Sequence, residues 1–412
     1  MAIFQRSKQI KQLINSIGDG KVKVITGIRR SGKTYLLTTI FPKQLKENGL
    51  INSEGEVLII SLKGKDGDLK NKAKLVKHLN DKINRDKRFI VIDEVQQIKD
   101  FEEVLLEYKS QHKDKEFFVT GSNSKILSKE IFRKFQESGL EIHIAPLTFK
   151  EIREELPNYS VDEYLKYGGL PLIVNETKEK REEELNRIYD ELYVNDINDK
   201  LKGFNYITPT KITDILKTIF STTSEISTKE VAKRFLNGID YEIKEKQILI
   251  KEIEEAIQLL IDSYLIEEFE INSFNTPDIL ENLGMNKKYY CVDNGLLYIN
   301  CENEAQKDGI TLENAIYLCL RDKGIEAKGK IFLGRKNRKE GEIDFNYHKD
   351  GLDYHIQVTY EYHDGNHERE VENLLRFNDN SQKILVYKKD TSTISKEPTI
   401  KYIDCETYLL NN

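Results

Sequence analysis

One stretch near the start of the chain limits its possible folds more than any other: residues 26–34, Thr-Gly-Ile-Arg-Arg-Ser-Gly-Lys-Thr. It contains the spacing Gly-x4-Gly-Lys-Ser/Thr, which wraps backbone N–H groups around phosphates, brings a lysine to the β and γ oxygens and offers a hydroxyl to Mg²⁺. The run 21–25 before it indicates a strand and the run 35–40 after it a helix start, so free N–H groups and a positive helix end meet there. We predict that the loop binds a nucleotide through Gly27, Ile28, Arg29, Arg30, Ser31, Gly32, Lys33 and Thr34.

A second signal follows at residues 89–94, Phe-Ile-Val-Ile-Asp-Glu, where four apolar residues run into two carboxylates. A central parallel strand ends in this way at the ligand crevice of a doubly wound sheet. Asp93 is then placed to hold Mg²⁺ through water, and Glu94 to polarise an attacking water. Residues 117–123 are likewise an apolar run that ends in small polar residues. Ser122 or Asn123 therefore either touches the γ-phosphate and its water or forms an ordinary turn. Together these runs predict the α/β class and the doubly wound parallel sheet of a P-loop NTPase.

Composition indicates what kind of protein contains this domain. A chain of 412 residues has room for roughly two to four domains. Its formal net charge of −6 gives no bulk attraction to nucleic acid, so the basic stretch 63–88 is either a solvated helix face or a local nucleic-acid surface. No apolar run nears the roughly 20 residues of a membrane span, and the four cysteines lack CxxC spacing. We expect reduced thiols and a cytoplasmic protein with no membrane partner.

The middle of the chain is predicted to be mostly helical. Residues 159–205 are expected to form a helical lid or linker, and residues 206–282 look like a winged-helix module. The expected elements of this module are helices at 212–220 and 248–263, a capping box at 227–230 and a wing strand at 266–271. The helix at 248–263 is acidic, so we favour a structural or protein-binding role for the module over DNA binding.

Several stretches together resemble one family, the AAA-type ATPases of bacteria and archaea that carry a C-terminal nuclease-like domain. The matching stretches are 25–34, 92–96, 120–124, 146–151, 167–171 and 290–296, which span nearly the whole chain. The resemblance implies ATP and Mg²⁺ as cofactors and a polar sensor at Asn123. One stretch departs from it: relatives tend to carry Gly-Arg after the sensor strand, whereas residues 136–140 are Gln-Glu-Ser-Gly-Leu. Arg133 or Arg153 would have to serve as arginine finger, so fast turnover is not implied.

The C-terminal part resembles the PD-(D/E)xK nuclease core, where an acid on a helix, an aspartate on a strand and a Glu/Gln-x-Lys strand assemble one metal site. The residues that match are Glu313, Asp344 and Gln357, with Glu342 as a nearby carboxylate. The resemblance implies a second Mg²⁺ site made of oxygen ligands. Thr359 holds the place of the lysine, and Gln357 is neutral, so we predict a retained scaffold that does not cleave. The basic run 335–339 can still meet a phosphate backbone.

The sequence therefore predicts four parts with distinct roles. These are an AAA-type P-loop ATPase domain at 1–158, a helical lid or linker at 159–205, a winged-helix-like module at 206–282 and a restriction-endonuclease-like α/β domain at 283–412. We expect Mg²⁺-dependent ATP hydrolysis that acts as a switch or slow motor, with Asp93, Glu94 and Asn123 in the chemistry. The alternatives are an ATP-controlled nuclease, a nucleic-acid-binding protein with a purely structural nucleotide site, and a GTPase, although no Asn-Lys-x-Asp motif follows the loop. Candidate partners are DNA or RNA, another protein and further copies of the chain.

Overall fold

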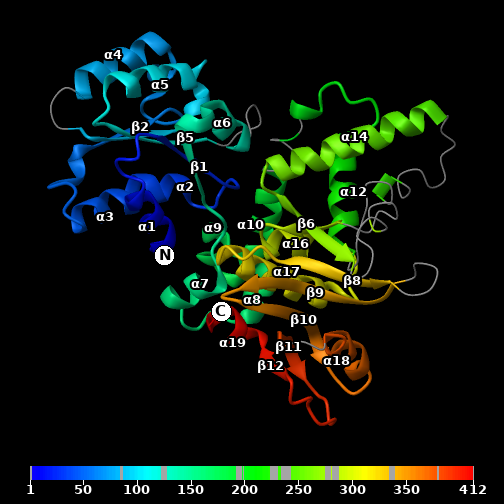
Figure 1. Cartoon of the computed structure of the whole chain (residues 1–412). Helices are drawn as coiled ribbons and strands as arrows, with labels where there is room; N and C mark the ends of the chain where they lie inside the picture. The colour runs from blue at the N-terminus through cyan, green and yellow to red at the C-terminus, as the bar shows by residue number, and fades with distance from the viewer. Residues whose placement is uncertain are drawn as a thin grey trace.

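The computed structural model describes residues 2–83, 87–121, 128–191, 197, 199–222, 231–232, 243–273, 280, 287–333, 339–377 and 380–411. Within these residues the chain forms two β-sheets with a group of helices between them (Figure 1). The first sheet lies in the blue and cyan N-terminal part, and most of the second lies in the yellow to red C-terminal part. Across the described ranges, no helix combines the length and the apolar character that crossing a membrane requires.

Five parallel strands make the first sheet, in the order β2-β3-β4-β1-β5. They are β1 Val22–Thr26, β2 Val57–Ser61, β3 Phe89–Asp93, β4 Glu116–Thr120 and β5 Gly139–His143. Strands β1, β3 and β4 are buried along their whole length, which is typical of central parallel strands. The parallel sheet of a P-loop NTPase fold, which the apolar runs predicted, is therefore confirmed.

Helices cover both faces of this sheet. Helices α1 (Ser7–Asn15) and α3 (Phe41–Glu47) pack on one face, and α4 (Lys72–Ile83), α5 (Phe101–Gln111) and α6 (Ser128–Phe135) pack on the other. Successive residues of β3 divide between the two faces, with Phe89 and Val91 toward α1 and α3, and Ile90 and Ile92 toward α4 and α5. Because side chains alternate along a strand, one unbroken apolar run supplies two separate cores.

The helices that follow are α7 Phe149–Glu155, α8 Val161–Tyr167, α9 Pro171–Val174, α10 Lys178–Tyr189, α12 Pro209–Phe220 and α14 Ile243–Asp262. The helices expected at 212–220 and 248–263 correspond to α12 and α14, and α14 ends one residue earlier than expected, at Asp262. The capping box expected at 227–230 falls outside the described residues. Helices α7 and α8 pack in one core with the C-terminal part, where Phe149 and Tyr164 share a cluster with Leu312 and Ile316. The packing therefore crosses the domain boundary expected at 158.

Seven strands make the second sheet, which is mixed and runs in the order β12-β11-β10-β9-β8-β6-β7. The strands are β6 Ile266–Ser273, β7 Lys287–Cys291, β8 Lys328–Leu333, β9 Lys339–Lys349, β10 Leu352–Tyr362, β11 Gln382–Asp390 and β12 Ile400–Asp404. The helices of this part are α16 Asn294–Asn300, α17 Lys307–Asp322, α18 His367–Leu375 and α19 Cys405–Asn411. Helices α17 and α19 bury one apolar cluster against the sheet, and α18 buries another.

The strand expected as a separate wing requires a correction. Residues 266–271 do form a strand, β6, but it pairs antiparallel with β7 and parallel with β8 inside the seven-stranded sheet. Its apolar side chains Phe269 and Ile271 join the core that contains Tyr290 and Phe345. The boundary expected at 282 therefore cuts through one sheet. An alternating apolar pattern indicates a strand, but it does not show which sheet that strand joins.

Candidate functional site

The glycine loop lies between β1 and a helical turn, α2, at Lys33–Tyr35. Three of its residues have left-handed backbone: Gly27 has φ 129°, Arg30 has φ 66° and Gly32 has φ 97°. A Cβ on Gly27 would lie 2.2 Å from the carbonyl oxygen of Ile144, so a side chain there collides with the backbone. The first glycine of the spacing is thus required by a close approach, and Gly32 by its positive φ.

Lys33 lies inside the curve of the loop. Its Nζ donates to the carbonyl oxygens of Gly27 and Ile28, each at 2.8 Å, and the side chain is buried. Burial lowers the pKa of Lys33 to about 8, while Glu94 and Asp93 act in the opposite direction. A buried ammonium so close to two carboxylates, in a cavity wall, is a strong point charge for an anion.

The two predicted magnesium residues lie in direct contact. Thr34 Oγ1 donates to Asp93 Oδ1 at 2.8 Å, and Thr120 Oγ1 donates to the same oxygen at 2.6 Å. Thr120 ends β4 next to β3, so the sheet order aligns it with Asp93. No pattern marked Thr120 as a site residue, although it ends an apolar strand and begins the matching stretch 120–124.

Glu94 is held by neighbours that the sequence analysis also missed. Its backbone has φ 63°, which is uncommon for a residue with a side chain. One carboxylate oxygen pairs with Lys63 Nζ at 3.1 Å, and the other accepts from the side chain of Gln96. Asn123 and Ser122, the expected sensor residues, lie outside the described residues.

A cavity of about 970 Å³ is bordered by Lys33, Thr34, Lys63, Glu94 and Thr120, and Asp93 contacts it through Thr34 and Thr120. The loop residues that line it are Arg29, Arg30, Ser31, Gly32, Lys33 and Thr34. Ile28 instead packs into the core of α10, α12 and α14. An apolar wall comes from parts of the chain that no motif marked: Ile3 near the N-terminus and Tyr35 are 44% and 45% exposed, and Leu172 of α9 also lines the cavity. Such a wall suits the flat face of a base.

The two arginines named as substitutes for an arginine finger have other partners. Arg133 forms two contacts of 3.2 Å with the carboxylate of Asp262 in α14. Arg153 pairs with Glu406 of α19 at 2.5 Å. Neither arginine lines the nucleotide cavity.

The three predicted C-terminal residues line a second cavity of about 880 Å³, together with Glu342. Asp344 accepts a hydrogen bond from the N–H of Val358 at 2.7 Å, and burial followed by Glu313 and Glu342 raises its pKa well above the usual range. Gln357 is buried, and its Oε1 has no hydrogen-bond partner within the described ranges. Thr359 lies on β10 where a lysine was expected, and Arg335, Lys336 and Arg338 lie outside the described residues.

A lysine does reach this acidic group, but from another strand. Lys288 of β7 pairs with Glu313 at 2.5 Å, and the hydroxyl of Tyr290 donates to the same carboxylate at 2.5 Å. Burial alone would lower the pKa of Lys288, but Glu313 and then Glu342 outweigh it and raise the pKa. In the described part of the chain, no three His, Cys, Asp or Glu side chains gather as a metal site.

Comparison with known families defines the class of the N-terminal part. Residues 19–153 match a family model described as an AAA domain. With the parallel sheet and the glycine loop, this match supports a P-loop domain of the AAA type. Residues 158–307 match a model described as a domain of unknown function, which spans β6 and β7 and ends at the start of α17.

Two proteins that are similar to most of the chain are described as uncharacterised. An uncharacterised protein of Methanocaldococcus jannaschii is 29% identical over 392 residues, which cover 90% of this chain and 80% of the relative. An uncharacterised protein of Haemophilus influenzae is 26% identical over 398 residues, 93% of each chain.

Among solved structures, the Aeropyrum pernix ORC1 protein in complex with DNA matches with a TM-score of 0.30 and 10% identity, over 74% of this chain and 93% of that one. Replication initiator DnaA bound to AMPPCP and single-stranded DNA matches with a TM-score of 0.28 and 13% identity, over 62% and 86%. Scores this low decide nothing about activity.

Proposed function

We propose that this chain binds ATP with Mg²⁺ and hydrolyses it as a switch or slow motor. The observation that carries the proposal is the 2.8 Å hydrogen bond between Thr34 and Asp93, which are 59 residues apart, beside Lys33 at one cavity. A phosphate loop, a hydroxyl and a strand-end carboxylate are needed together for a nucleotide–magnesium complex. Their convergence supports the proposal more than any one motif does.

The residues present fit a magnesium ion. Thr34 offers a hydroxyl oxygen and Asp93 a carboxylate oxygen, and Mg²⁺ prefers hard oxygen ligands. When bound, the ion neutralises charge on the β and γ oxygens. Lys33 would give up its contacts with the loop carbonyls for the phosphates, Asp93 would hold the ion through water, and the apolar wall with Tyr35 would take the base.

Glu94 is the proposed group that orients and polarises water. Lys63 and Gln96 each engage one oxygen of its carboxylate, and the lone pairs that remain on these oxygens can hold a water. The absence of Arg133 and Arg153 from the cavity lining favours slow turnover. The sensor role of Asn123 stays part of the proposal.

The remaining parts would respond to the nucleotide. Ile28 of the loop packs in the helical core, and Arg30 lies 3.4 Å from Glu191 just beyond α10. Movement of the loop would therefore displace the winged-helix-like module and, through the shared sheet, the nuclease-like domain. We propose that this nuclease-like domain is a retained scaffold. The division into parts is likewise proposed, with one seven-stranded sheet shared across residue 282.

The test measures ATP affinity by calorimetry and phosphate release in the full chain, with and without DNA, RNA and cell extract. Lys33→Ala should weaken ATP binding at least roughly tenfold, because it removes a charged hydrogen-bond donor at the phosphates. Lys43→Ala, an exposed lysine on α3, is the matched control and should change nothing. Equal ATP affinity in Lys33→Ala and the wild type would refute the loop assignment. Competition by GTP as strong as that by ATP would favour a GTPase.

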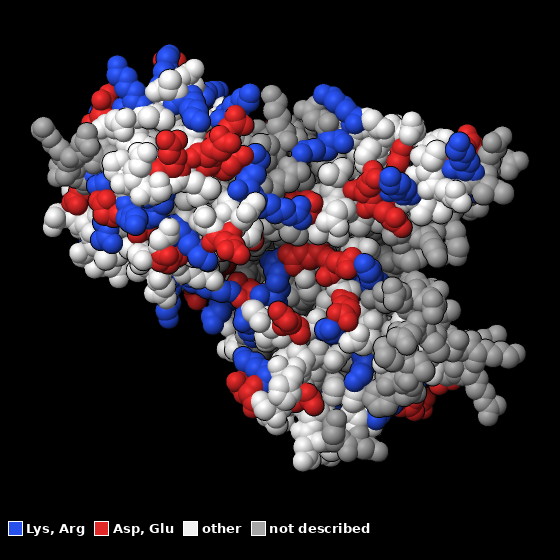
Figure 2. Space-filling model, turned by 45° about the horizontal axis from the view of Figure 1, so that its top comes forward, with Lys and Arg blue, Asp and Glu red and all other residues white. Residues whose placement is uncertain are grey.

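A second candidate is a nucleic-acid-binding protein whose nucleotide site is only structural. It is favoured by exposed lysines before and along α4, among them Lys65, Lys70 and Lys74. Figure 2 shows Lys and Arg side chains interspersed with Asp and Glu over the visible face, so a contact of this kind would be local. Salt-dependent binding of DNA or RNA without any phosphate release would support this candidate over the first.

A further inference from the structure

A buried arginine just before α1, Arg6, contacts the nucleotide loop and borders the same cavity. Arg6 is 5% exposed and has a left-handed backbone with φ 53°. A left-handed non-glycine residue costs on the order of 1 kcal/mol and persists only where its surroundings dictate it. No local sequence pattern marks Arg6.

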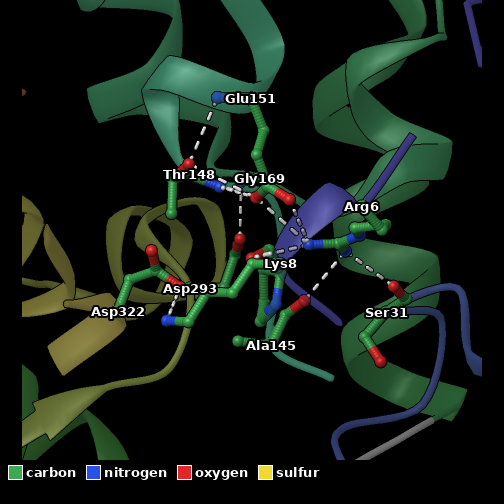
Figure 3. A network of polar contacts seen from close by, with 10 residues as sticks. Arg6, Lys8, Ser31, Ala145, Thr148, Glu151, Gly169, Asp293 and Asp322 are labelled. Atoms are coloured by element: carbon green, nitrogen blue, oxygen red, sulfur yellow. Dashed lines mark hydrogen bonds and ion pairs between the residues drawn. The ribbon is translucent and has the colours of Figure 1, made fainter. Parts of the chain in front are cut away.

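The guanidinium joins the loop to the connector between β5 and α7. Its Nη2 donates to the carbonyl oxygens of Ser31 at 2.9 Å and Ala145 at 2.8 Å (Figure 3). Its Nη1 donates to the Glu151 carboxylate at 3.2 Å and contacts the carbonyl oxygen of Pro146 at 3.5 Å. Charged donors on buried carbonyls make strong hydrogen bonds, so the loop and the connector are tied at this point.

The bond to Ser31 sets the direction of a neighbouring N–H group. A trans peptide is planar, so the carbonyl of Ser31 and the N–H of Gly32 point in opposite directions. With the carbonyl held by Arg6, the N–H of Gly32 is turned away from Arg6. Gly32, which follows this peptide, has a φ of 97°, and glycine tolerates a flip that other residues resist. A contact from outside the loop is needed to keep one orientation.

The connector under Arg6 is itself clamped by the rest of the chain. Leu147 N donates to Gly169 O at 2.7 Å, and Gly169 N donates to Asp293 Oδ2 at 2.7 Å. The other oxygen of Asp293 accepts from Gly295 at 2.9 Å and so caps α16. Figure 3 shows Gly169 and Asp293 beside the contacts of Arg6 with the loop and the connector. The support for the loop therefore extends into the C-terminal part.

We propose that Arg6 is a positioning residue of the nucleotide site. It holds the Ser31–Gly32 peptide so that the Gly32 N–H is available to phosphate. The connector that Arg6 also contacts is held in turn by the C-terminal part. The inference rests on the proposed ATP function. Arg6 acts through the peptide, so its loss should weaken nucleotide binding more than it slows the chemistry of bound ATP.

The experiment measures phosphate release against ATP concentration in the full chain for the wild type, Arg6→Gln, Arg6→Lys and Lys8→Ala. Arg6→Gln should raise KM for ATP roughly 10- to 100-fold with little change in kcat, because charged hydrogen bonds to Ser31 and its neighbours are lost. Arg6→Lys should raise KM less, since one ammonium can keep only part of the contacts. Lys8→Ala removes an exposed pair with Asp322, 3.0 Å long, beside the same network and should leave KM unchanged.

The split between KM and kcat separates positioning from a purely structural role. Loss of folded protein lowers kcat without changing KM, so that pattern in Arg6→Gln, or an unchanged KM, would overturn the assignment. If Arg6→Gln does not fold, Arg6→Lys decides, and an unchanged KM again overturns it. If the wild type is active, an unchanged KM in these variants refutes only the role of Arg6. If the wild type neither binds nor hydrolyses ATP, both the proposed function and the role of Arg6 are refuted.

Discussion

Replacing Gly169 with alanine should break the junction between the nucleotide domain and the C-terminal part. A Cβ at this position would lie 2.0 Å from the carbonyl oxygen of Leu147 and 2.9 Å from its carbonyl carbon. Backbone atoms cannot move aside as a flexible side chain can. The two segments must therefore separate, although the alanine itself needs no unusual φ.

The separation affects two hydrogen bonds of 2.7 Å, one from Leu147 N to Gly169 O and one from Gly169 N to the buried carboxylate of Asp293. A neutral backbone bond contributes about 1 kcal/mol and a bond to a charged group about 1.5–3 kcal/mol. We expect Gly169→Ala to lower the free energy of unfolding by about 3 kcal/mol. It should also weaken ATP binding, because Pro171 and Leu172, which line the cavity, follow directly.

Urea unfolding followed by circular dichroism, together with calorimetric ATP binding, measures both effects. Gly309→Ala is the matched control, since a Cβ there meets nothing within 4 Å and Gly309 lies in the first turn of α17. Alanine at this helical position should stabilise by about 0.5 kcal/mol. If Gly169→Ala matched the stability and the ATP affinity of the control, the close approach at Leu147 would not exist and the reasoning would be refuted.

Three further predictions concern the chemistry. Glu94→Gln should keep ATP and Mg²⁺ bound but slow phosphate release by roughly 10²- to 10⁴-fold; if it abolished binding while Asp93→Asn kept metal-dependent activity, the two roles would be exchanged. Because burial lowers the pKa of Lys33 to about 8, its ammonium loses the proton above that pH. ATP affinity should therefore be steady up to about pH 7 and fall by about pH 9, with a flat profile in Lys33→Ala; a flat wild-type profile would contradict the assignment. The chain should not cleave DNA or RNA with Mg²⁺ or Mn²⁺, since Gln357 is neutral and Thr359 stands two residues later in place of a lysine; plasmid nicking that Asp344→Ala abolishes would show an ATP-controlled nuclease instead.

The nucleotide loop and the strands around it were predictable because they depend on neighbouring residues. The glycine spacing places Gly27 and Gly32 where positive φ or a close approach excludes other residues. Unbroken apolar runs such as β3 mark buried parallel strands, and parallel strands bring their carboxyl ends to one edge. Contact between Thr34 and Asp93 follows from these local facts.

The partners of these residues depended on the tertiary structure. Arg6 reaches Ser31, Lys63 reaches Glu94 and Lys288 reaches Glu313 across gaps of 25 to 31 residues, without any pattern near them. The local sequence likewise does not show that β6 belongs to the seven-stranded sheet. A chain segment records its own preference for helix, strand or turn in its local sequence. Which distant surface covers it depends on how all segments bury their apolar faces together, and only the folded molecule determines that.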